Sequence, residues 1–456
     1  RIPQMTQLLY SPADSGAKFP WFSQNGTDNR TDMMETQSTK INENLKWETT
    51  ITRNFGIDFG FWKGRLSGSL DLYWNTTKDL LMRAEIPGDN GYTTQYQNFG
   101  QTSNKGIELQ FNAVLVDTKN FSLNFMGNIA YNQNKIDKLA TGAEWQSSNW
   151  GGLAQYEDYS VVEGGKLGEL WGYKMNGYYT CWTQNNPDGD LYFNNGKWLP
   201  VIGVNENGKP ITADPGAAGT DQSYKLFGGN LYPGAPKVQT DENGDAIKQR
   251  LGNTVAPVAG GFGINGTVLG NFDFNVFFNY SIGNKIVNGT KLALSYYSGS
   301  AKEYNLNGDF AIDNRYTWLD PETGMNLGRP SSSTQEAFPG DKLGDRLNEI
   351  NANANIWNPA AATAMRLTDY AVEDASFLRL QQITIGYSLP KKLLKKFSCK
   401  GLRVYFTGSN LFCWTNYSGN DPEVDVSSKK NAMCPGVDYA SYPKSRTYMF
   451  GVNLSF

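Results

Sequence analysis

The 456-residue sequence contains no histidine. Without an imidazole the chain cannot form a Ser-His-Asp or Cys-His catalytic arrangement, a histidine-containing zinc site or a histidine general base. Catalysis by carboxylates alone stays open, since a glycosidase needs only two acids, but none of the 44 acidic residues stands in a diagnostic setting. The sequence therefore predicts a protein that is not an enzyme, and we expect no cofactor.

Cysteine is scarce, and its four positions lack the C-x-x-C spacing of metal clusters. Cys413 and Cys434 flank one expected loop and could form a disulfide in an oxidising compartment; free thiols are an equal alternative. The segment DENGDA at 241–246 resembles the start of a calcium loop, but it has Ala246 where an EF-hand needs Gly and Gly252 where it needs Glu. We interpret it as an Asn-Gly turn and expect no metal site.

Long apolar runs are also missing. No stretch of about 18 apolar residues exists, which excludes a transmembrane helix. The net charge of -3 argues against nucleic-acid binding as a main role. The chain is instead rich in turn-formers and aromatics, with 49 Gly, 25 Tyr, 24 Phe and 12 Trp. A polar average remains compatible with a membrane protein, because barrel strands hide their apolar signal in alternation.

The last eleven residues, RTYMFGVNLSF, alternate in polarity. One parity carries Tyr448, Phe450, Val452, Leu454 and Phe456, and the other is mostly polar. Period two predicts a β-strand with one apolar face. About ten residues at roughly 3.3 Å each, tilted by about 40°, rise roughly 25 Å, which is the apolar height of an outer-membrane barrel.

The same alternation recurs along the chain and predicts nine strands. They lie at about 47–60, 65–80, 105–116, 121–134, 258–269, 272–286, 376–389, 401–412 and 445–456. The phase slips at Gln381 and Gln382, which predicts a β-bulge. A further pair of strands is expected near 160–180.

The connections between these strands are of two sizes. Short turns are expected at 61–64, 117–120, 270–271 and 390–400, and long polar stretches at roughly 82–104, 135–257, 289–375 and 413–444. Short connections on one side and long ones on the other are typical of outer-membrane barrels, with periplasmic turns and extracellular loops. A soluble sandwich has no reason to separate loop lengths in this way. The sequence predicts an all-β fold, a transmembrane antiparallel β-barrel.

The direction of the strands bears on the N-terminal region. If the last strand ends in the periplasm, the first predicted strand also runs inward, so that residues 1–46 form an extracellular loop entry and 47–456 the strands and loops. An odd strand count with an extracellular start predicts that N-terminal strands are missing or carried by a separate chain.

Seven segments, in order, resemble a known family. They are NFGIDFGFWKGRLSGSLDLYWNTTKDLL, NKGIELQFNA, NIAYNQNKIDKL, GELWGYKMNGYYT, SFLRLQQITIGYSLPKKLLKK, LRVYFTGSNLFCWTNYSGNDPEV and PGVDYASYPKSRTYMFGVNLSF. They closely resemble the C-terminal half of SusC/RagA-like TonB-dependent transporters of the Bacteroidetes outer membrane. The resemblance extends over nearly the whole chain from about residue 45.

This resemblance implies the C-terminal portion of a 22-stranded barrel with a plugged lumen. The N-terminal plug, the TonB box and the first strands would precede residue 1. It also implies a SusD-like surface lipoprotein that covers the barrel, uptake of an oligosaccharide or an oligopeptide powered through the TonB complex, and contact with membrane lipid and lipopolysaccharide. A passive porin or structural surface barrel is the alternative of a different class.

The resemblance also gives the C-terminal strand a role. The terminal Phe456, with Tyr448 and Phe450, fits the pattern that barrel-assembly machinery recognises in its clients. The alternative is that these are aromatic residues facing lipid at the membrane boundary, and both can hold together.

The long loops contain the candidate substrate-binding residues. These are Trp145, Trp150, Tyr156, Trp182, Tyr192 and Trp198, which stand among Asn, Gln and Asp. Aromatic faces stack on sugar rings while the polar neighbours bind hydroxyl groups, and the same set could hold a peptide backbone. Alternatively, these aromatics only pack each loop into a compact unit.

Overall fold

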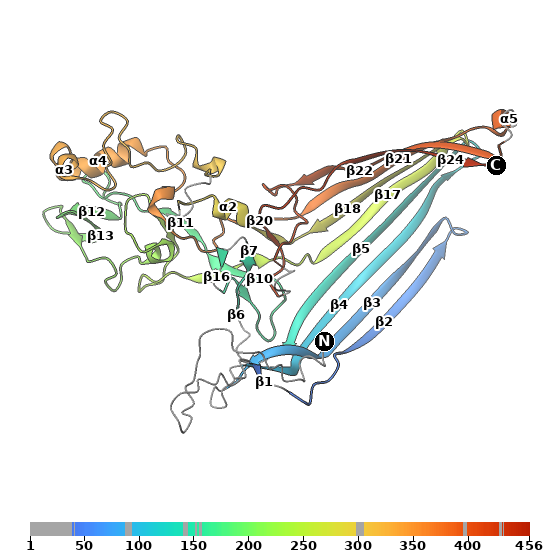
Figure 1. The fold of residues 1–456 in the computed structure, drawn as a ribbon, viewed down its shortest axis with the longest axis horizontal. Coiled ribbons are helices and arrows are strands. Elements are labelled where there is room, and N and C mark those ends of the chain that lie inside the picture. Colours follow the sequence, from blue (N-terminus) through green and yellow to red (C-terminus); the bar gives the residue numbers. More distant parts are fainter. Residues whose placement is uncertain are drawn as a thin grey trace, which may run out of the picture. The chain divides into compact units, whose positions relative to one another are not determined.

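A computed structural model describes residues 39–40, 42–86, 94–139, 145–150, 153–154, 157–297, 305–394, 399–427, 431 and 433–456. The chain divides into two compact units. The first unit comprises Arg1–Leu115, Asn124–Trp145 and Ser160–Leu167, and the second comprises Val116–Leu123, Gln146–Tyr159 and Gly168–Phe456. Figure 1 shows long strands in both units.

The first unit is built on an antiparallel series of long strands. They are β2 (Thr49–Phe61), β3 (Leu66–Glu85), β4 (Thr94–Asp117) and most of β5 (Phe121–Lys138), and the two-residue β1 (Thr39–Lys40) pairs with β4 in parallel. β3 pairs with β2 on one side and with β4 on the other. The four long strands β2 to β5 each exceed the roughly 10 residues that a strand needs to cross an apolar membrane layer.

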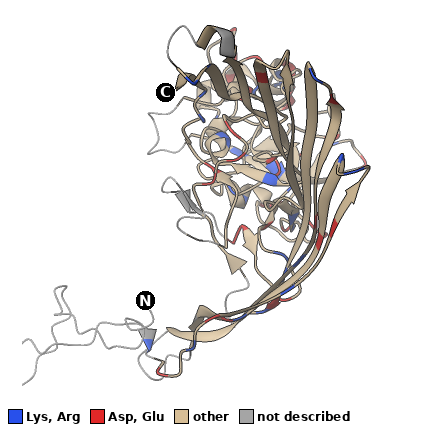
Figure 2. Cartoon of the chain, turned by 90° about the vertical axis from the view of Figure 1, so that its right-hand side faces the viewer, with Lys and Arg blue, Asp and Glu red and all other residues tan. Residues whose placement is uncertain are grey.

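Cross-strand rows in the first unit separate apolar from polar side chains. Phe55, Leu72 and Ile107 lie opposite one another in one such row, on a face where Phe55 and Ile107 are exposed. On the other face Tyr73 Oη donates a hydrogen bond to Asn132 Oδ1 over 2.9 Å. Figure 2 shows few charged residues along the length of the strands. An apolar face exposed over this length is suited to a lipid environment.

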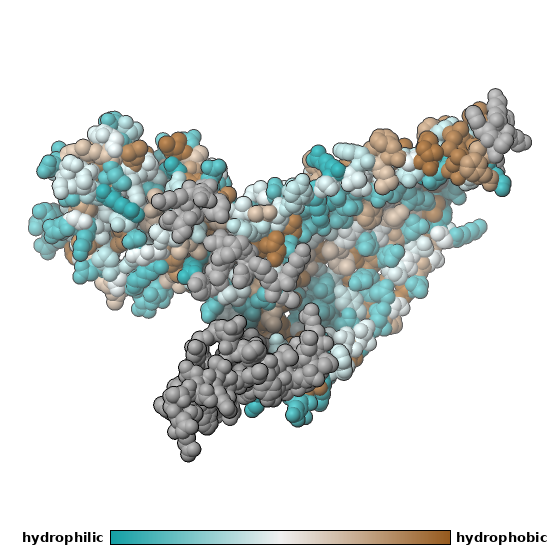
Figure 3. Space-filling view, viewed as in Figure 1, coloured by the Kyte–Doolittle hydropathy of each residue, from teal (hydrophilic) through white to brown (hydrophobic). Residues whose placement is uncertain are grey.

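The second unit contains five further antiparallel strands in the same arrangement. They are β17 (Val258–Val268), β18 (Phe272–Ile282), β21 (Phe377–Ser388), β22 (Gly401–Thr415) and β24 (Thr447–Ser455), paired in that order. Phe450 and Val452 of β24 are exposed. Apolar residues gather over the strands near the C-terminus in Figure 3.

The bulge predicted in β21 is confirmed. The register shifts between Leu380 and Gln382 in the pairing with β22, and between Phe277 and Phe278 in the pairing with β18, so Gln381 is skipped in both ladders. The extra residue restores the alternation after the phase slip.

All nine predicted strands are present, and the short turns are where they were expected. One boundary prediction is wrong: the stretch 82–104 is mostly strand, because β3 and β4 stay paired as far as Glu85 and Thr94. The backbone of this stretch continues the β3–β4 hydrogen bonds outside any apolar layer. Most of its side chains are polar, so they show no sustained apolar alternation that would predict a strand. Two strands are present near 160–180, but each pairs with a distant segment: β10 (Glu169–Tyr173) pairs with β16 (Lys248–Asn253), and β11 (Met175–Tyr178) with β15 (Pro236–Val238).

The long connections of the second unit fold into small sheets and short helices. The strands are β9 (Tyr159–Ser160), β12 (Leu191–Asn194), β13 (Lys197–Val204), β14 (Pro210–Thr212), β19 (Lys285–Asn288), β20 (Val372–Asp374) and β23 (Val437–Asp438). The helices are η2 (Ser223–Phe227), α2 (Gly289–Ala293), η3 (Gly308–Phe310), α3 (Ser332–Ala337), α4 (Asp341–Ile350), η4 (Pro359–Ala361) and, in the turn between β21 and β22, α5 (Lys391–Leu394). Three two-residue strands lie further upstream: β6 (Trp145–Gln146), β7 (Asn149–Trp150) and β8 (Leu153–Ala154). None of the helices described is both long and apolar enough to cross a membrane.

These connections have hydrophobic cores of their own. One cluster includes Tyr159, Leu170, Val287 and Trp357, and another includes Tyr179, Leu191, Leu343 and Leu347. The aromatic and aliphatic residues that interrupt the polar loop sequence are therefore used largely for packing, which holds the connections in fixed conformations.

Candidate functional site

The structure places the aromatic residues singled out from the sequence in different environments. Trp182 and Trp198 are 3% and 5% exposed, and Trp198 Nε1 donates to Gly328 O over 2.9 Å. Tyr192 is partly exposed, with its ring 5.7 Å from that of Trp182. Burial of the two tryptophans favours the packing interpretation for them.

Trp145 remains accessible, at 37% exposed. Trp150 is described only as part of the backbone of β7, and Tyr156 lies outside the described residues. None of the six candidate residues contributes to the lining of the cavities described below.

A pocket of about 370 Å³ lies elsewhere in the long connections of the second unit. It is lined by Met175, Gly177, Tyr178, Asn355, Ile356, Trp357, Asp369 and Tyr370. The lining comes from three segments: β11, the chain after α4, and the chain before β20. Its volume lies within the range of small-ligand sites, toward the lower end.

β11 forms one wall of this pocket. Met175 N–H donates to Asp369 Oδ1 over 2.9 Å, and Tyr178 Oη donates to Ala354 O over 2.8 Å, so both ends of the strand are tied to the other two segments. Gly177 between them has φ +78°, and no atom lies within 4 Å of the position a Cβ would take. Glycine adopts this left-handed conformation readily, and the place that a side chain would take is open.

Aromatic rings form the opposite wall. The Trp357 and Tyr370 ring centroids are 4.9 Å apart with an interplanar angle of 77°, and Phe310 packs edge-on against Trp357 at 5.2 Å. Trp357 Nε1 donates to Ser295 O over 3.2 Å. Edge-to-face packing with a satisfied indole nitrogen fixes these rings before any ligand arrives.

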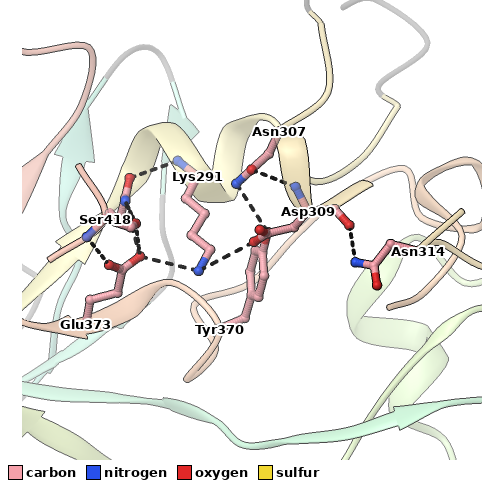
Figure 4. A network of polar contacts seen from close by, with 8 residues as sticks. Lys291, Asn307, Asp309, Asn314, Tyr370, Glu373 and Ser418 are labelled. Atoms are coloured by element: carbon pink, nitrogen blue, oxygen red, sulfur yellow. Dashed lines mark hydrogen bonds and ion pairs between the residues drawn. The ribbon is translucent and has the colours of Figure 1, made fainter. Parts of the chain in front are cut away.

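A charged network holds Tyr370 from behind (Figure 4). Lys291 Nζ lies 4.3 Å from the Tyr370 ring centroid, 3.4 Å from Glu373 Oε1 and 3.7 Å from Asp309 Oδ2. Tyr370 Oη donates to Asp309 Oδ2 over 3.0 Å. Burial, and then the Asp309 carboxylate, raise the pKa of Tyr370, so its hydroxyl stays protonated and continues to donate.

The mouth of the pocket offers polar groups beside these rings. Asn355 is exposed, and its Nδ2 donates to Asn314 Oδ1 over 2.9 Å and to Asn353 O over 3.2 Å. Asp369 is also exposed. Aromatic surface beside an amide and a carboxylate suits a polyhydroxylated or amide-rich ligand. No group of three or more acidic or cysteine side chains in the described ranges is placed to hold a metal ion.

Sequence reasoning missed this pocket, although its segments carry a recognisable signal. NANANIWNP and LTDYAVED each place one aromatic residue among Asn or Asp, as the nominated loops do. What the sequence could not supply is their proximity, since β11 and Tyr370 are joined only through contacts between distant segments.

A buried ion-pair network was also missed. Arg379 of β21 is 5% exposed, and its Nη2 lies 2.8 Å from Asp421 Oδ1 and 2.9 Å from Glu423 Oε2. Lys444 Nζ is 2.7 Å from Glu423 Oε2. These contacts fasten the segment NDPEV, which follows β22, to the beginning of β21. The available signal was Arg379 itself, the only charged residue of β21.

Two open sequence questions have structural answers. Cys413 and Cys434 are free thiols, and Cys434 is buried, which raises the pKa of its thiol. In DENGDA, Asp241 Oδ1 accepts the N–H groups of Asn243 and Asp245, each over 2.9 Å, and Gly244 has φ +86°. This confirms the turn, since an Asp side chain that binds the backbone two residues on is typical of turns.

Comparisons with known proteins agree with this fold. The family described as TonB dependent receptor-like, beta-barrel matches residues 1–231. TonB-dependent receptor P3 of Formosa agariphila is 29% identical over 422 residues, covering 91% of this chain and 35% of that protein. TonB-dependent receptor SusC of Bacteroides thetaiotaomicron is 28% identical over 426 residues, covering 91% and 33%.

Solved structures show the same architecture. The RagAB peptide importer in its open-open state superposes with a TM-score of 0.60 at 21% identity, covering 95% of this chain and 37% of that one. The chain spans about a third of the length of the relatives it matches. With the paired strands, the exposed apolar faces and the separated connection lengths, these matches establish that the chain belongs to the TonB-dependent receptor-like β-barrel family of the bacterial outer membrane.

Proposed function

We propose that this chain forms part of the barrel wall and the extracellular surface of an active importer of oligosaccharides. The observation that carries the proposal is the pocket between β11, Asn355 and Tyr370, on the side of the long connections. Its preformed aromatic wall matches the apolar face of a sugar ring, and Asn355 and Asp369 match hydroxyl groups. The short turns at the other end of the strands support an extracellular position for this pocket.

For the whole protein we also propose a partner and an energy source. A SusD-like surface lipoprotein would cover the folded long connections, and TonB would drive release through a plug region. The similarity to a relative named SusC supports this assignment. Because a barrel of this width would leak without a plug, active import requires capture by the pocket followed by a plug movement.

An oligopeptide is the second candidate substrate. The exposed Asn355 amide and Asp369 carboxylate would serve a peptide backbone or a free amino terminus equally well. The solved RagAB structures are described as those of a peptide importer. A binding experiment with both classes of ligand separates the two.

The test measures calorimetric binding of a panel of oligosaccharides and oligopeptides to the full-length protein with its lipoprotein in detergent. Tyr178→Ala and Asn355→Ala are each expected to weaken glycan binding by about tenfold, since one aromatic or charge-free polar contact contributes roughly 1 kcal/mol. The matched control is Asn207→Ala, which removes an exposed amide in the hairpin between β13 and β14. It should leave the affinity for the glycan unchanged.

Trp145→Ala tests the accessible residue nominated from the sequence. A loss confined to this variant would move the site to the Trp145 loop. Wild-type affinity in Tyr178→Ala and Asn355→Ala would refute the pocket, and peptide binding without glycan binding would replace the substrate class.

A further inference from the structure

A second cavity, of about 540 Å³, lies in the first unit and is lined by an unusual number of cations. Arg53, Lys105, Lys135 and Lys166 contribute to its lining, and Asp137 is its one acidic residue. Trp74 and a set of amide and hydroxyl side chains complete it. The formal charge of the lining is therefore strongly positive in a chain whose net charge is -3.

The pairing register places two of these cations, Arg53 and Lys105, on the apolar face of the strands. Arg53, Trp74 and Lys105 lie opposite one another in a single row, two residues along from the row of Phe55, Leu72 and Ile107. Side chains two residues apart in a strand share a face. The basic row is therefore continuous with the face that contacts lipid, on the side away from the short turn after Phe61.

The four cations form no ion pair with any carboxylate in the described part of the chain. Among the described residues none of Arg53, Lys105, Lys135 and Lys166 takes part in a side-chain hydrogen bond or an ion pair. The carboxylate of Asp137 instead accepts from Gln101 Nε2 over 3.2 Å. Four like charges gathered without partners repel one another, so an anionic occupant would stabilise the arrangement.

We propose that this cavity binds the phosphate groups of an outer-leaflet glycolipid of the lipopolysaccharide class. The long connections begin at this end of the strands, which makes it the extracellular end. Trp74 lies at the boundary where aromatic residues of membrane proteins meet the headgroups. The acyl chains then cover Phe55 and Ile107 while the phosphates meet Arg53 and the lysines, a match that a soluble anion cannot make.

The experiment compares lipid retention by the full-length protein in detergent, with purified lipopolysaccharide, the same lipid after enzymatic dephosphorylation, and inorganic phosphate as probes. Each basic side chain near an anionic lipid surface contributes about a fivefold change in affinity. The double variant Lys105→Gln/Lys135→Gln should bind lipopolysaccharide roughly 25-fold more weakly. The control Lys63→Gln/Lys119→Gln removes two exposed lysines from the short turns and should bind as wild type.

A single variant keeps the test informative if the double variant inserts poorly. Lys166→Gln changes a residue outside the long strands and is expected to weaken lipid binding about fivefold. Dephosphorylated lipid should bind the wild type as weakly as intact lipid binds the double variant. Unchanged affinity in Lys166→Gln, equal binding of dephosphorylated lipid, or displacement of the lipid by stoichiometric inorganic phosphate would each overturn the proposal.

Discussion

At the scale of single residues, Asp320 shows how the long connections are held. Its side chain is 1% exposed, and Arg346 of α4 donates to Asp320 Oδ1 from Nη2 over 2.7 Å and from Nε over 3.0 Å. Burial alone would raise the pKa of this carboxyl, but the hydrogen bonds from Thr323 and Arg346 outweigh it and lower the pKa of Asp320. The ionised form is the one that fastens α4.

This lowered pKa predicts a pH dependence. A carboxyl whose pKa is lower in the folded state contributes stability above its unfolded value of about 3.9, and the contribution is lost as the pH falls through the folded value. The protection of the Leu343–Leu347 amides against hydrogen exchange, relative to the unfolded chain at the same pH, should therefore decrease below about pH 4. At pH 7, Asp320→Asn should accelerate the exchange roughly 30-fold, which corresponds to about 2 kcal/mol.

Glu349→Gln is the control, because Glu349 also contacts Arg346 but is 68% exposed. A solvent-screened pair contributes at most about 1 kcal/mol, so exchange should rise no more than a few-fold. Equal acceleration in the two variants would contradict the role given to Asp320.

The sequence could predict the kinds of residue in the candidate site but not their environment. Trp182, Trp198 and Trp357 are all tryptophans among polar neighbours, yet the first two are buried core residues and the third forms a wall of the pocket. The difference depends on which segments pack over each ring, which a single sequence does not reveal.

At the scale of elements, Gly386 allows three strands of the second unit to share an ion pair. Arg403 of β22 donates from Nε to Asp273 Oδ1 of β18 over 3.0 Å, and the pair passes over Gly386 of β21. A Cβ on Gly386 would lie 2.5 Å from Arg403 Nη2 and 2.6 Å from Asp273 Oδ1. A methyl group at this position would therefore displace the ends of these two side chains.

Gly386→Ala should separate Asp273 from Arg403 and lower the stability of the folded barrel by about 1–2 kcal/mol. The change would appear as a lower temperature for loss of the compact, heat-modifiable form on gels. Gly401→Ala is the control, since its added Cβ would meet no atom closer than 3.7 Å. If both variants unfold at the same temperature, the close approach at Gly386 does not contribute to the stability of the barrel.

The elements also show where sequence reasoning works and where it ends. The nine strands could be predicted because each must expose an apolar face to lipid, which imposes a period of two. The extension of β3 to Glu85 could not, because a strand in water needs no apolar face. The partners of β10 and β11 were likewise hidden, since Lys248–Asn253 lies about 80 residues from the strand it pairs with.

At the scale of the whole molecule, we propose that Phe456 acts in assembly rather than in stability. It is 77% exposed and follows the end of β24, and Tyr448 and Phe450 of the same strand are 59% and 81% exposed. Because Phe456 is so exposed, its removal costs the folded sheet little. A defect after its deletion would therefore report on recognition by the assembly machinery.

Deletion of Phe456 should reduce the amount of protein inserted in the outer membrane several-fold, while Phe456→Tyr, which keeps an aromatic terminus, should insert normally. Quantitative membrane fractionation measures both. Normal insertion of the truncated protein would leave Phe456 only a lipid-facing role.

The central claim is that this chain belongs to an importer that captures an oligosaccharide together with a surface lipoprotein. Native mass spectrometry of the full-length protein extracted in mild detergent tests it most directly. We expect a complex with a lipoprotein partner and with bound ligands. The masses of these ligands should differ from one another by hexose units. A barrel that is recovered alone, with neither lipoprotein nor ligand, would contradict it and favour a passive pore.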